Sequence, residues 1–174
     1  KTQLLAILLA TKYRKPLPII AGIFVATIAN HFLAALIGSQ VAGLLDSAAF
    51  RYAIGAGFIA MAAWTLIPDT LDDDDGAPKD ARFGAFFATA IAFFIVEMGD
   101  KTQVATIALG AQFQDAVVLV TMGTTLGMMI ANVPAVYLGH VVHEKVPLGV
   151  VRAIAALMFL VLGLWVIADT AGWF

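Results

Sequence analysis

The sequence predicts an all-α integral membrane protein whose six transmembrane helices form two inverted three-helix repeats. Its composition, its long apolar runs and a polar pattern that occurs twice support this fold. Of the 174 residues, 61% are hydrophobic and only 13% are charged, whereas soluble domains have about 45–50% and about 25%. Apolar runs of about 20 residues favour helices, because barrel strands would be about 10 residues long and alternating.

Six apolar segments are predicted to be membrane helices. Because the first begins with Lys1 directly in an apolar run, we expect the natural chain to start further upstream. We place the first repeat, truncated at its N-terminus, at residues 1–68, an acidic linker at 69–82 and the second repeat at 83–174. The six segments cover residues 1–13, 17–37, 52–67, 83–110, 116–139 and 148–168.

The positive charges of the loops predict the orientation in the membrane. Seven loop lysines and arginines, including those of the linker, fall on one side, and only Arg51 falls on the other. The positive-inside rule therefore places the linker in the cytoplasm and both termini outside, in a membrane that we expect to be the bacterial inner (plasma) membrane. The run Asp72–Asp75 in the linker is interpreted as a solvated loop, with a role in concentrating or sensing cations as the alternative.

Composition also excludes several kinds of partner and site. The net charge is −2 and no basic patch is present, so nothing in the chain favours binding of nucleic acid. The absence of cysteine excludes disulfides and thiolate metal sites. We expect no bound cofactor.

Three charged side chains interrupt the apolar segment 83–110, where the surroundings should be hydrocarbon. On a continuous helix, Glu97, Asp100 and Lys101 would share one face. Each such charge costs about 2.5–3.5 kcal/mol at a helix centre, so charges without a use are seldom kept. Gly99 is interpreted as a site where a neighbouring backbone comes close. Acidic oxygens at this depth indicate a pathway for cations.

The chain contains an internal repeat. Lys1-Thr2-Gln3 recurs as Lys101-Thr102-Gln103, at the start of similar apolar patterns. Three helices per repeat is an odd number, so the two halves must cross the membrane in opposite directions, as in many secondary transporters. The residues before Lys1 are then expected to resemble residues 97–100. Further matches pair Ile7, Leu9, Gly22, Ala34 and Gly38 with Ile107, Leu109, Gly123, Ala135 and Gly139, and place His31 opposite Asn132.

The run Glu97-Met98-Gly99-Asp100-Lys101-Thr102, in a six-helix inverted repeat with an acidic central loop, resembles the Gdt-type divalent cation/proton antiporters. That family includes bacterial manganese exporters and Golgi manganese/calcium transporters. Only the end of the first copy of the motif is present, as Lys1-Thr2. The resemblance implies that the two motifs face each other and bind one cation, with Glu97 and Asp100 as metal ligands. It makes Lys101 and Thr102 motif partners, with Lys1 and Thr2 as their counterparts.

The oxygen chemistry of these residues fits a hard divalent cation, with Mn²⁺ or Ca²⁺ as the substrate. Four amide side chains (Gln3, Gln103, Asn30 and Asn132) could add ligands, although such amides also serve as hydrogen bonds between helices. Two carboxylates here and two expected before Lys1 would together exceed the charge of one divalent ion, so some must be protonated or paired with lysine. Metal entry would then release protons, which predicts exchange of the cation for protons.

Some roles and functions stay open from the sequence alone. Lys101 is interpreted first as a counter-ion to Glu97, and second as an occupant of the empty site that the cation displaces. His31 could relay protons or simply pack. The alternative functions are export of another small solute, such as a basic amino acid, on the same repeat plan, and an intramembrane metal-dependent enzyme. The oligomeric state is not predicted.

Overall fold

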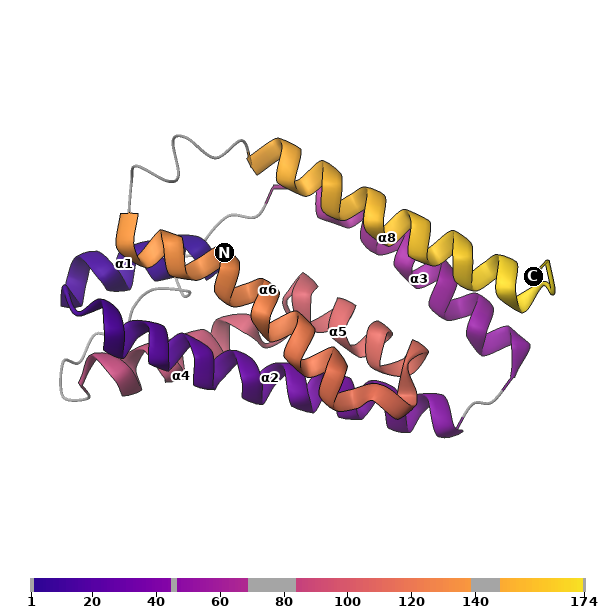
Figure 1. Ribbon diagram of the computed structural model, residues 1–174, viewed down its shortest axis with the longest axis horizontal. Helices are drawn as coiled ribbons and strands as arrows, with labels where there is room; N and C mark the ends of the chain where they lie inside the picture. Colours follow the sequence, from indigo (N-terminus) through magenta and orange to yellow (C-terminus); the bar gives the residue numbers. More distant parts are fainter. Residues whose placement is uncertain (1, 45–46, 69–83, 139–147, 174) are drawn as a thin grey trace. The chain divides into compact units, whose positions relative to one another are not determined.

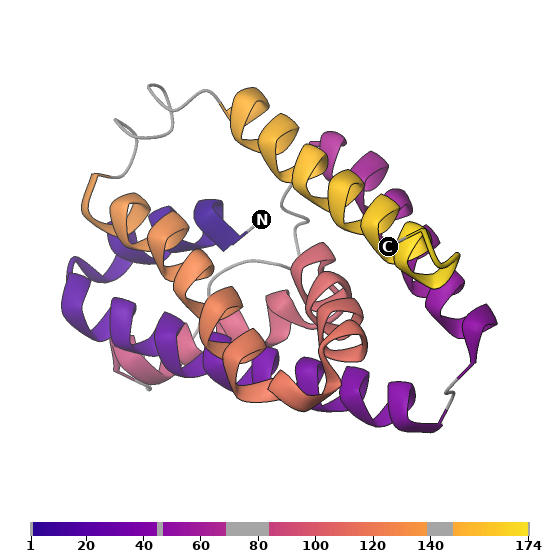
Figure 2. The ribbon, with the colours of Figure 1, turned by 45° about the vertical axis from the view of Figure 1, so that its right-hand side comes forward.

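The computed structural model describes residues 2–44, 47–68, 84–138 and 148–173, and every element in these ranges is helical (Figures 1 and 2). Lys1 and the run Asp72–Asp75 lie outside the described residues. The elements are α1 (Thr2–Tyr13), α2 (Pro16–Leu44), α3 (Ala48–Leu66), α4 (Ala85–Glu97), α5 (Lys101–Gln112), the 3₁₀ turn η2 (Gln114–Ala116), α6 (Val117–Leu138) and α8 (Leu148–Thr170).

Four of these helical stretches are long and apolar enough to cross a membrane, and α4 is a shorter apolar helix. This confirms the prediction of an all-helical membrane protein, while the count of six spans and their inverted relation stay predictions. The segment 83–110 differs from the prediction, because it forms two helices, α4 and α5, instead of one. The four long stretches are Pro16–Ala42, Ala48–Leu66, Gln114–Tyr137 and Gly149–Thr170.

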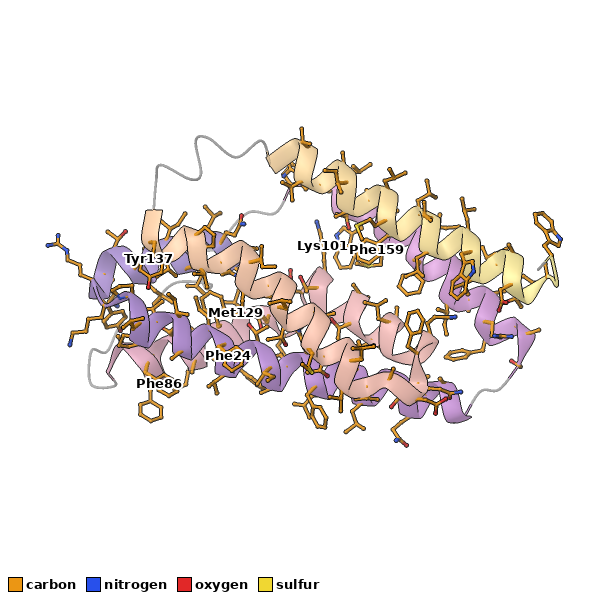
Figure 3. All side chains as sticks on the ribbon, in the orientation of Figure 1. Phe24, Phe86, Lys101, Met129, Tyr137 and Phe159 are labelled. Atoms are coloured by element: carbon orange, nitrogen blue, oxygen red, sulfur yellow. The ribbon has the colours of Figure 1, made fainter. Side chains whose placement is uncertain are left out.

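Large apolar side chains extend from the outer surfaces of the helices, as Figure 3 shows for Phe24 and Tyr137. Phe24 is 45% exposed and Tyr137 is 57% exposed. In water such surfaces would be costly, but in a bilayer they meet lipid tails that are equally apolar. Association of the helices therefore depends on close packing and on polar contacts between them.

The chain divides into two compact units, and each unit takes segments from both predicted repeats. The first unit comprises residues 1–31, 69–100 and 121–146, and the second comprises residues 32–68, 101–120 and 147–174. The chain passes from one unit to the other between Asp100 and Lys101, inside the charged motif.

In the first unit, α1 packs against α4 around a core of fully buried side chains. Leu5 and Leu9 of α1 lie in this core with Ile23 of α2 and Phe93 of α4. Gly22 brings α2 close to α4, because a Cβ atom at this position would lie 2.7 Å from the carbonyl oxygen of Phe86. This close approach allows side chains further along α2 to reach the end of α4.

In the second unit, α3 packs along α8. Gly55 and Gly163 lie where the two helices touch, since a Cβ atom on Gly163 would lie 2.7 Å from the carbonyl oxygen of Gly55. The rings of Phe58 and Phe159 stack with centroids 6.3 Å apart. Small residues at such contacts let helices approach closely in a membrane, so α3 and α8 form a closely packed pair.

The close contact at Gly22 predicts a stability difference between two glycines that the sequence pairs. Gly22→Ala should lower the stability of the protein by about 1–3 kcal/mol, because the added methyl group collides with backbone atoms of α4. Gly123→Ala is the matched control, since a Cβ atom there meets no atom of the described residues within 4 Å and alanine favours a helix over glycine by about 0.5–1 kcal/mol. Thermal unfolding in detergent would test this, and equal melting temperatures for the two variants would contradict it.

Candidate cation site

The charged motif lies at a break between two helices. The helix α4 ends at Glu97, α5 begins at Lys101, and the residues between them form a turn. The amide N–H groups of Met98 and Asp100 donate to the carbonyl oxygens of Ile95 and Glu97, at 3.2 and 3.1 Å. The prediction that Glu97, Asp100 and Lys101 share one face of a continuous helix is therefore wrong.

Gly99 explains why the helix ends here. Its φ angle is +79°, in the left-handed region that glycine adopts without the steric cost of a side chain. Among the described residues, a Cβ atom at Gly99 would meet nothing within 4 Å. The predicted close approach of a neighbouring backbone is thus wrong, and the glycine serves the conformation of the turn.

Glu97 is buried, with 2% of its surface exposed, and two side chains of α2 hold its carboxylate. Thr27 Oγ1 donates to Oε1 at 2.9 Å. Asn30 Nδ2 donates to Oε2 at 3.3 Å and to the carbonyl oxygen of Phe94 at 3.0 Å. Both carboxylate oxygens are therefore fixed in position by the same helix face, because residues three apart on a helix are neighbours.

The role of Thr27 was missed in the sequence. Threonine is common in membrane helices, where its hydroxyl often bonds to its own helix. A signal was present, because Thr27 and Asn30 are spaced three residues apart in an otherwise apolar segment. The two side chains reach Glu97 only because α2 packs close to α4, and the sequence does not show this packing.

The electrostatics at Glu97 favour a positive partner. Glu97 is the last residue of α4, where the helix dipole already places partial negative charge. A buried carboxylate at this end is costly unless a cation or a proton compensates it. Beside it, Asn30 Oδ1 is buried and accepts no hydrogen bond from the described residues. Carboxylate and amide oxygens are the donors that hard divalent cations prefer.

Lys101 contacts the C-terminal end of α3. Its ammonium group donates to the carbonyl oxygens of Trp64 and Ile67, at 3.1 and 2.8 Å, while the Glu97 oxygens bind Thr27 and Asn30. The role of Lys101 as a counter-ion to Glu97 stays a prediction. The C-terminal carbonyls of a helix attract an ammonium group because they lack partners within the helix.

A second polar group in the first unit joins the start of α1 to the middle of α6. Gln3 Nε2 donates to the carbonyl oxygen of Ala131 at 3.3 Å, and Thr2 Oγ1 to the Sδ atom of Met128 at 3.7 Å. Asn132 is completely buried; its Nδ2 donates to the carbonyl oxygen of Met128 at 3.0 Å, and its Oδ1 has no donor among the described residues. Gln3 thus acts as an interhelical hydrogen bond.

The remaining residues that the sequence analysis singled out differ in burial. Asp100, Thr102 and Gln103 are partly buried at the break and at the start of α5. His31 is buried, and neither ring nitrogen has a hydrogen-bond partner in the described part of the chain. No group of three or more His, Cys, Asp or Glu side chains gathers within the described ranges.

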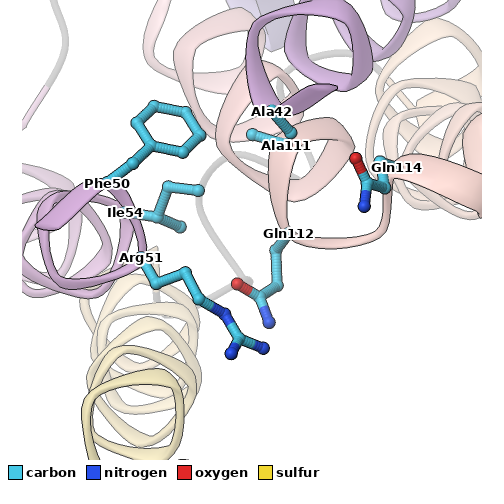
Figure 4. A pocket seen from close by; sticks show the side chains of 7 residues that line it. All are labelled: Ala42, Phe50, Arg51, Ile54, Ala111, Gln112 and Gln114. Atoms are coloured by element: carbon cyan, nitrogen blue, oxygen red, sulfur yellow. The ribbon is translucent and has the colours of Figure 1, made fainter. Parts of the chain in front are cut away.

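One cavity of about 230 Å³ lies in the second unit, at the opposite end of α5 from the motif. Arg51 and Gln112 are the long polar side chains labelled among its lining residues in Figure 4. The guanidinium of Arg51 also pairs with Asp169 at 3.2 Å. None of the predicted site residues that the structure describes lines this cavity. Its lining residues are Ala42, Phe50, Arg51, Ile54, Ala111, Gln112 and Gln114.

The hydrogen bond between Thr27 and Glu97 predicts opposite effects for two buried threonines. Thr27→Val should lower stability by about 1.5–3 kcal/mol, because it removes a hydrogen bond to a buried charged group. Thr89→Val is the matched control: Thr89 is equally buried, and its hydroxyl has no partner in the described residues. Its replacement should leave the melting temperature unchanged or raise it. A loss of stability in Thr89→Val as large as in Thr27→Val would contradict this account.

Comparison with known proteins assigns the family. The family model described as "Divalent cation/proton antiporter GDT1" matches residues 1–73 and 85–173. A Vibrio cholerae protein named "Putative manganese exporter" is 51% identical over 164 residues, which cover 94% of this chain and 80% of that protein. A GDT1-like protein of Schizosaccharomyces pombe is 30% identical over 84 residues, 48% of this chain and 31% of that protein. No solved structure matches. The chain belongs to the GDT1 family of divalent cation/proton antiporters.

Proposed function

We propose that this protein exports Mn²⁺ across the bacterial inner membrane in exchange for protons, and that Glu97 and Asp100 are ligands of the cation. Membership of an antiporter family points to transport and not to an enzyme. The name of the Vibrio cholerae relative supports manganese as the substrate. The observation that carries the proposal is the buried carboxylate of Glu97, with both oxygens held by α2 at the end of a broken helix.

A broken helix supplies what a cation site inside a membrane needs. Transporters commonly use discontinuous helices, in which carbonyl-bearing C-terminal ends and unwound backbone coordinate the cation. Here α4 ends in Glu97, and Asp100 lies in the turn that follows. Asn30 Oδ1 offers an amide oxygen beside the carboxylate. These groups form an oxygen-rich site of the kind that Mn²⁺ accepts.

The same carboxylate can couple cation and proton movement. When Mn²⁺ binds, the carboxyl groups must be ionised, so binding releases protons. When the metal leaves, a proton can neutralise the buried Glu97, because an uncompensated charge in this environment is costly. Thr27 and Asn30 hold the side chain in place during both states. Cation and proton thus compete for one group, which is the basis of exchange.

We infer that the group around Asn132 is the second half of the site, related to the first by an inverted repeat of six helices. Several features support this relation. The helices α1 and α5 are each 12 residues long. The first begins with Thr2-Gln3, and the second begins with Lys101 followed by Thr102-Gln103. The tripeptide Ile-Ala-Asn ends at Asn30 in α2 and at Asn132 in α6, one residue out of the register that pairs His31 with Asn132. In this arrangement the linker 69–82 faces the cytoplasm and both termini lie outside.

The donor set bears on the choice between Mn²⁺ and Ca²⁺. Carboxylate and amide oxygens suit both ions. The sulfur of Met128 lies beside this second group, within 3.7 Å of Thr2 Oγ1. A thioether near the site favours Mn²⁺, since Ca²⁺ is bound almost entirely by oxygen. We therefore expect higher apparent affinity for Mn²⁺ than for Ca²⁺.

Proton flux driven by Mn²⁺ in proteoliposomes tests the proposal. Glu97→Gln and Asp100→Asn should each abolish this flux, because each removes a carboxylate that must bind the cation and give up a proton. Asp115→Asn is the control, since Asp115 is an exposed residue of η2 and should transport normally. In a strain lacking its manganese exporter, the wild type should restore manganese tolerance and Asp100→Asn should not. Full Mn²⁺-dependent flux in Glu97→Gln would refute the role of Glu97.

A further inference from the structure

His31 of α2 is a buried side chain that the proposed exchange does not use. Only 1% of its surface is exposed, and neither Nδ1 nor Nε2 has a hydrogen-bond partner among the described residues. A neutral imidazole has one N–H donor and one nitrogen with a free lone pair. Burying both without partners is costly, so a leucine would pack here at lower cost. The imidazole therefore indicates a polar partner that the described residues do not supply.

The course of α2 along α4 places His31 beside the candidate cation site. Within the first unit, Gly22 lies against the first half of α4 and Asn30 against its last residue, so the two helices run in the same direction. His31 lies four residues beyond Thr27, whose hydroxyl donates to Glu97 at 2.9 Å. Residues four apart on a helix are neighbours on one face, with Cβ atoms about 5–6 Å apart. His31 is therefore one turn beyond the contact with Glu97, in the direction of the helix break.

The position of His31 in the membrane fits a role at the same site. It lies near the middle of the apolar stretch Pro16–Ala42, which is long enough to cross a membrane. The predicted repeat pairs it with Asn132 of α6, which is also buried and whose Oδ1 has no donor among the described residues. Within the described structure, each half of the predicted repeat thus has an unused lone pair at this position. A cation that crosses the membrane can bind to such lone pairs.

An imidazole nitrogen distinguishes transition-metal ions from Ca²⁺. Calcium is bound in proteins by oxygen ligands. The affinity of sites that contain nitrogen for first-row divalent metals rises from Mn²⁺ through Fe²⁺ and Co²⁺ to Cu²⁺. A ring nitrogen added to the carboxylate and amide oxygens of Glu97 and Asn30 would therefore strengthen the binding of Mn²⁺. It would strengthen the binding of Co²⁺ more and add nothing to the binding of Ca²⁺.

We propose that His31 is a nitrogen ligand of the transported cation and gives the site its preference for transition-metal ions over Ca²⁺. The inference rests on the proposed function, because it adds a ligand to the site that contains Glu97. One ring nitrogen gives its lone pair to the cation, and the other carries the hydrogen atom. The neighbouring Asn30 holds this part of α2 in place through its bonds to Glu97 and to the carbonyl oxygen of Phe94.

Pulsed electron paramagnetic resonance of Mn²⁺ bound to the purified full chain tests this contact directly. A nitrogen atom that coordinates Mn²⁺ modulates the electron spin echo. Labelling histidine alone with ¹⁵N changes the modulation if that nitrogen belongs to an imidazole. The chain has three histidines, so the control His140→Asn/His143→Asn retains His31 alone. We expect the signal in the wild type and in this control, and we expect His31→Asn to lose it.

Binding calorimetry with three cations separates a ligand from a structural residue. His31→Asn should weaken Mn²⁺ binding by about 10-fold, because even the partners that orient metal ligands change affinity by about 10-fold to 100-fold when mutated. It should weaken Co²⁺ binding more and leave Ca²⁺ binding unchanged. A residue that only packs would change all three affinities alike. If His31→Asn does not fold, the labelled wild type and the labelled control still show whether His31 binds the cation.

Mn²⁺ binding without nitrogen modulation, or modulation that persists in His31→Asn, would overturn the inference, as would an equal loss of affinity for the three cations. Failure of the proposed function gives a different result. In that case the wild type binds no Mn²⁺ and shows no Mn²⁺-dependent proton flux in proteoliposomes, which rejects the function and the inference together. Mn²⁺-dependent flux in a wild type whose bound Mn²⁺ gives no histidine signal rejects only the inference.

Discussion

A buried carboxylate at the end of a helix is the constraint on which the rest of this structure depends. Glu97 lies in apolar surroundings, at the helix end where the dipole is negative. The surrounding structure supplies what this charge needs: Thr27 and Asn30 hold both of its oxygens. Gly22 lets α2 come close enough to α4, and Gly99 ends the helix directly after the carboxylate.

The break divides the motif between the two units of the fold, with Glu97 in the first and Lys101 in the second. Glu97 is bound by neutral side chains, whereas Lys101 binds the carbonyls at the end of α3. Because only neutral side chains are seen to donate to the Glu97 carboxylate within the first unit, the acid needs a positive partner. In our account that partner alternates between a divalent cation and a proton.

The sequence predicted the membrane class and indicated Glu97 as a candidate ligand, because apolar length and an intramembrane acid are visible locally. It did not reveal the break, because a hydropathy pattern carries no information on the sign of φ at Gly99. Thr27 was missed because its contact depends on how two helices pack. Two of the partners of Lys101 are backbone carbonyl oxygens 34 and 37 residues away in the chain, and no side-chain pattern encodes such contacts.

The most direct test of the central claim is whether Mn²⁺ binding releases protons from Glu97. Mn²⁺ would be added to the purified protein in weakly buffered detergent solution, with calorimetry to measure binding and an indicator dye to count protons. We predict that binding releases protons in the wild type and in Asp115→Asn, and that this release is lost in Glu97→Gln. Binding of Mn²⁺ without proton release, or the same release from Glu97→Gln, would contradict the account.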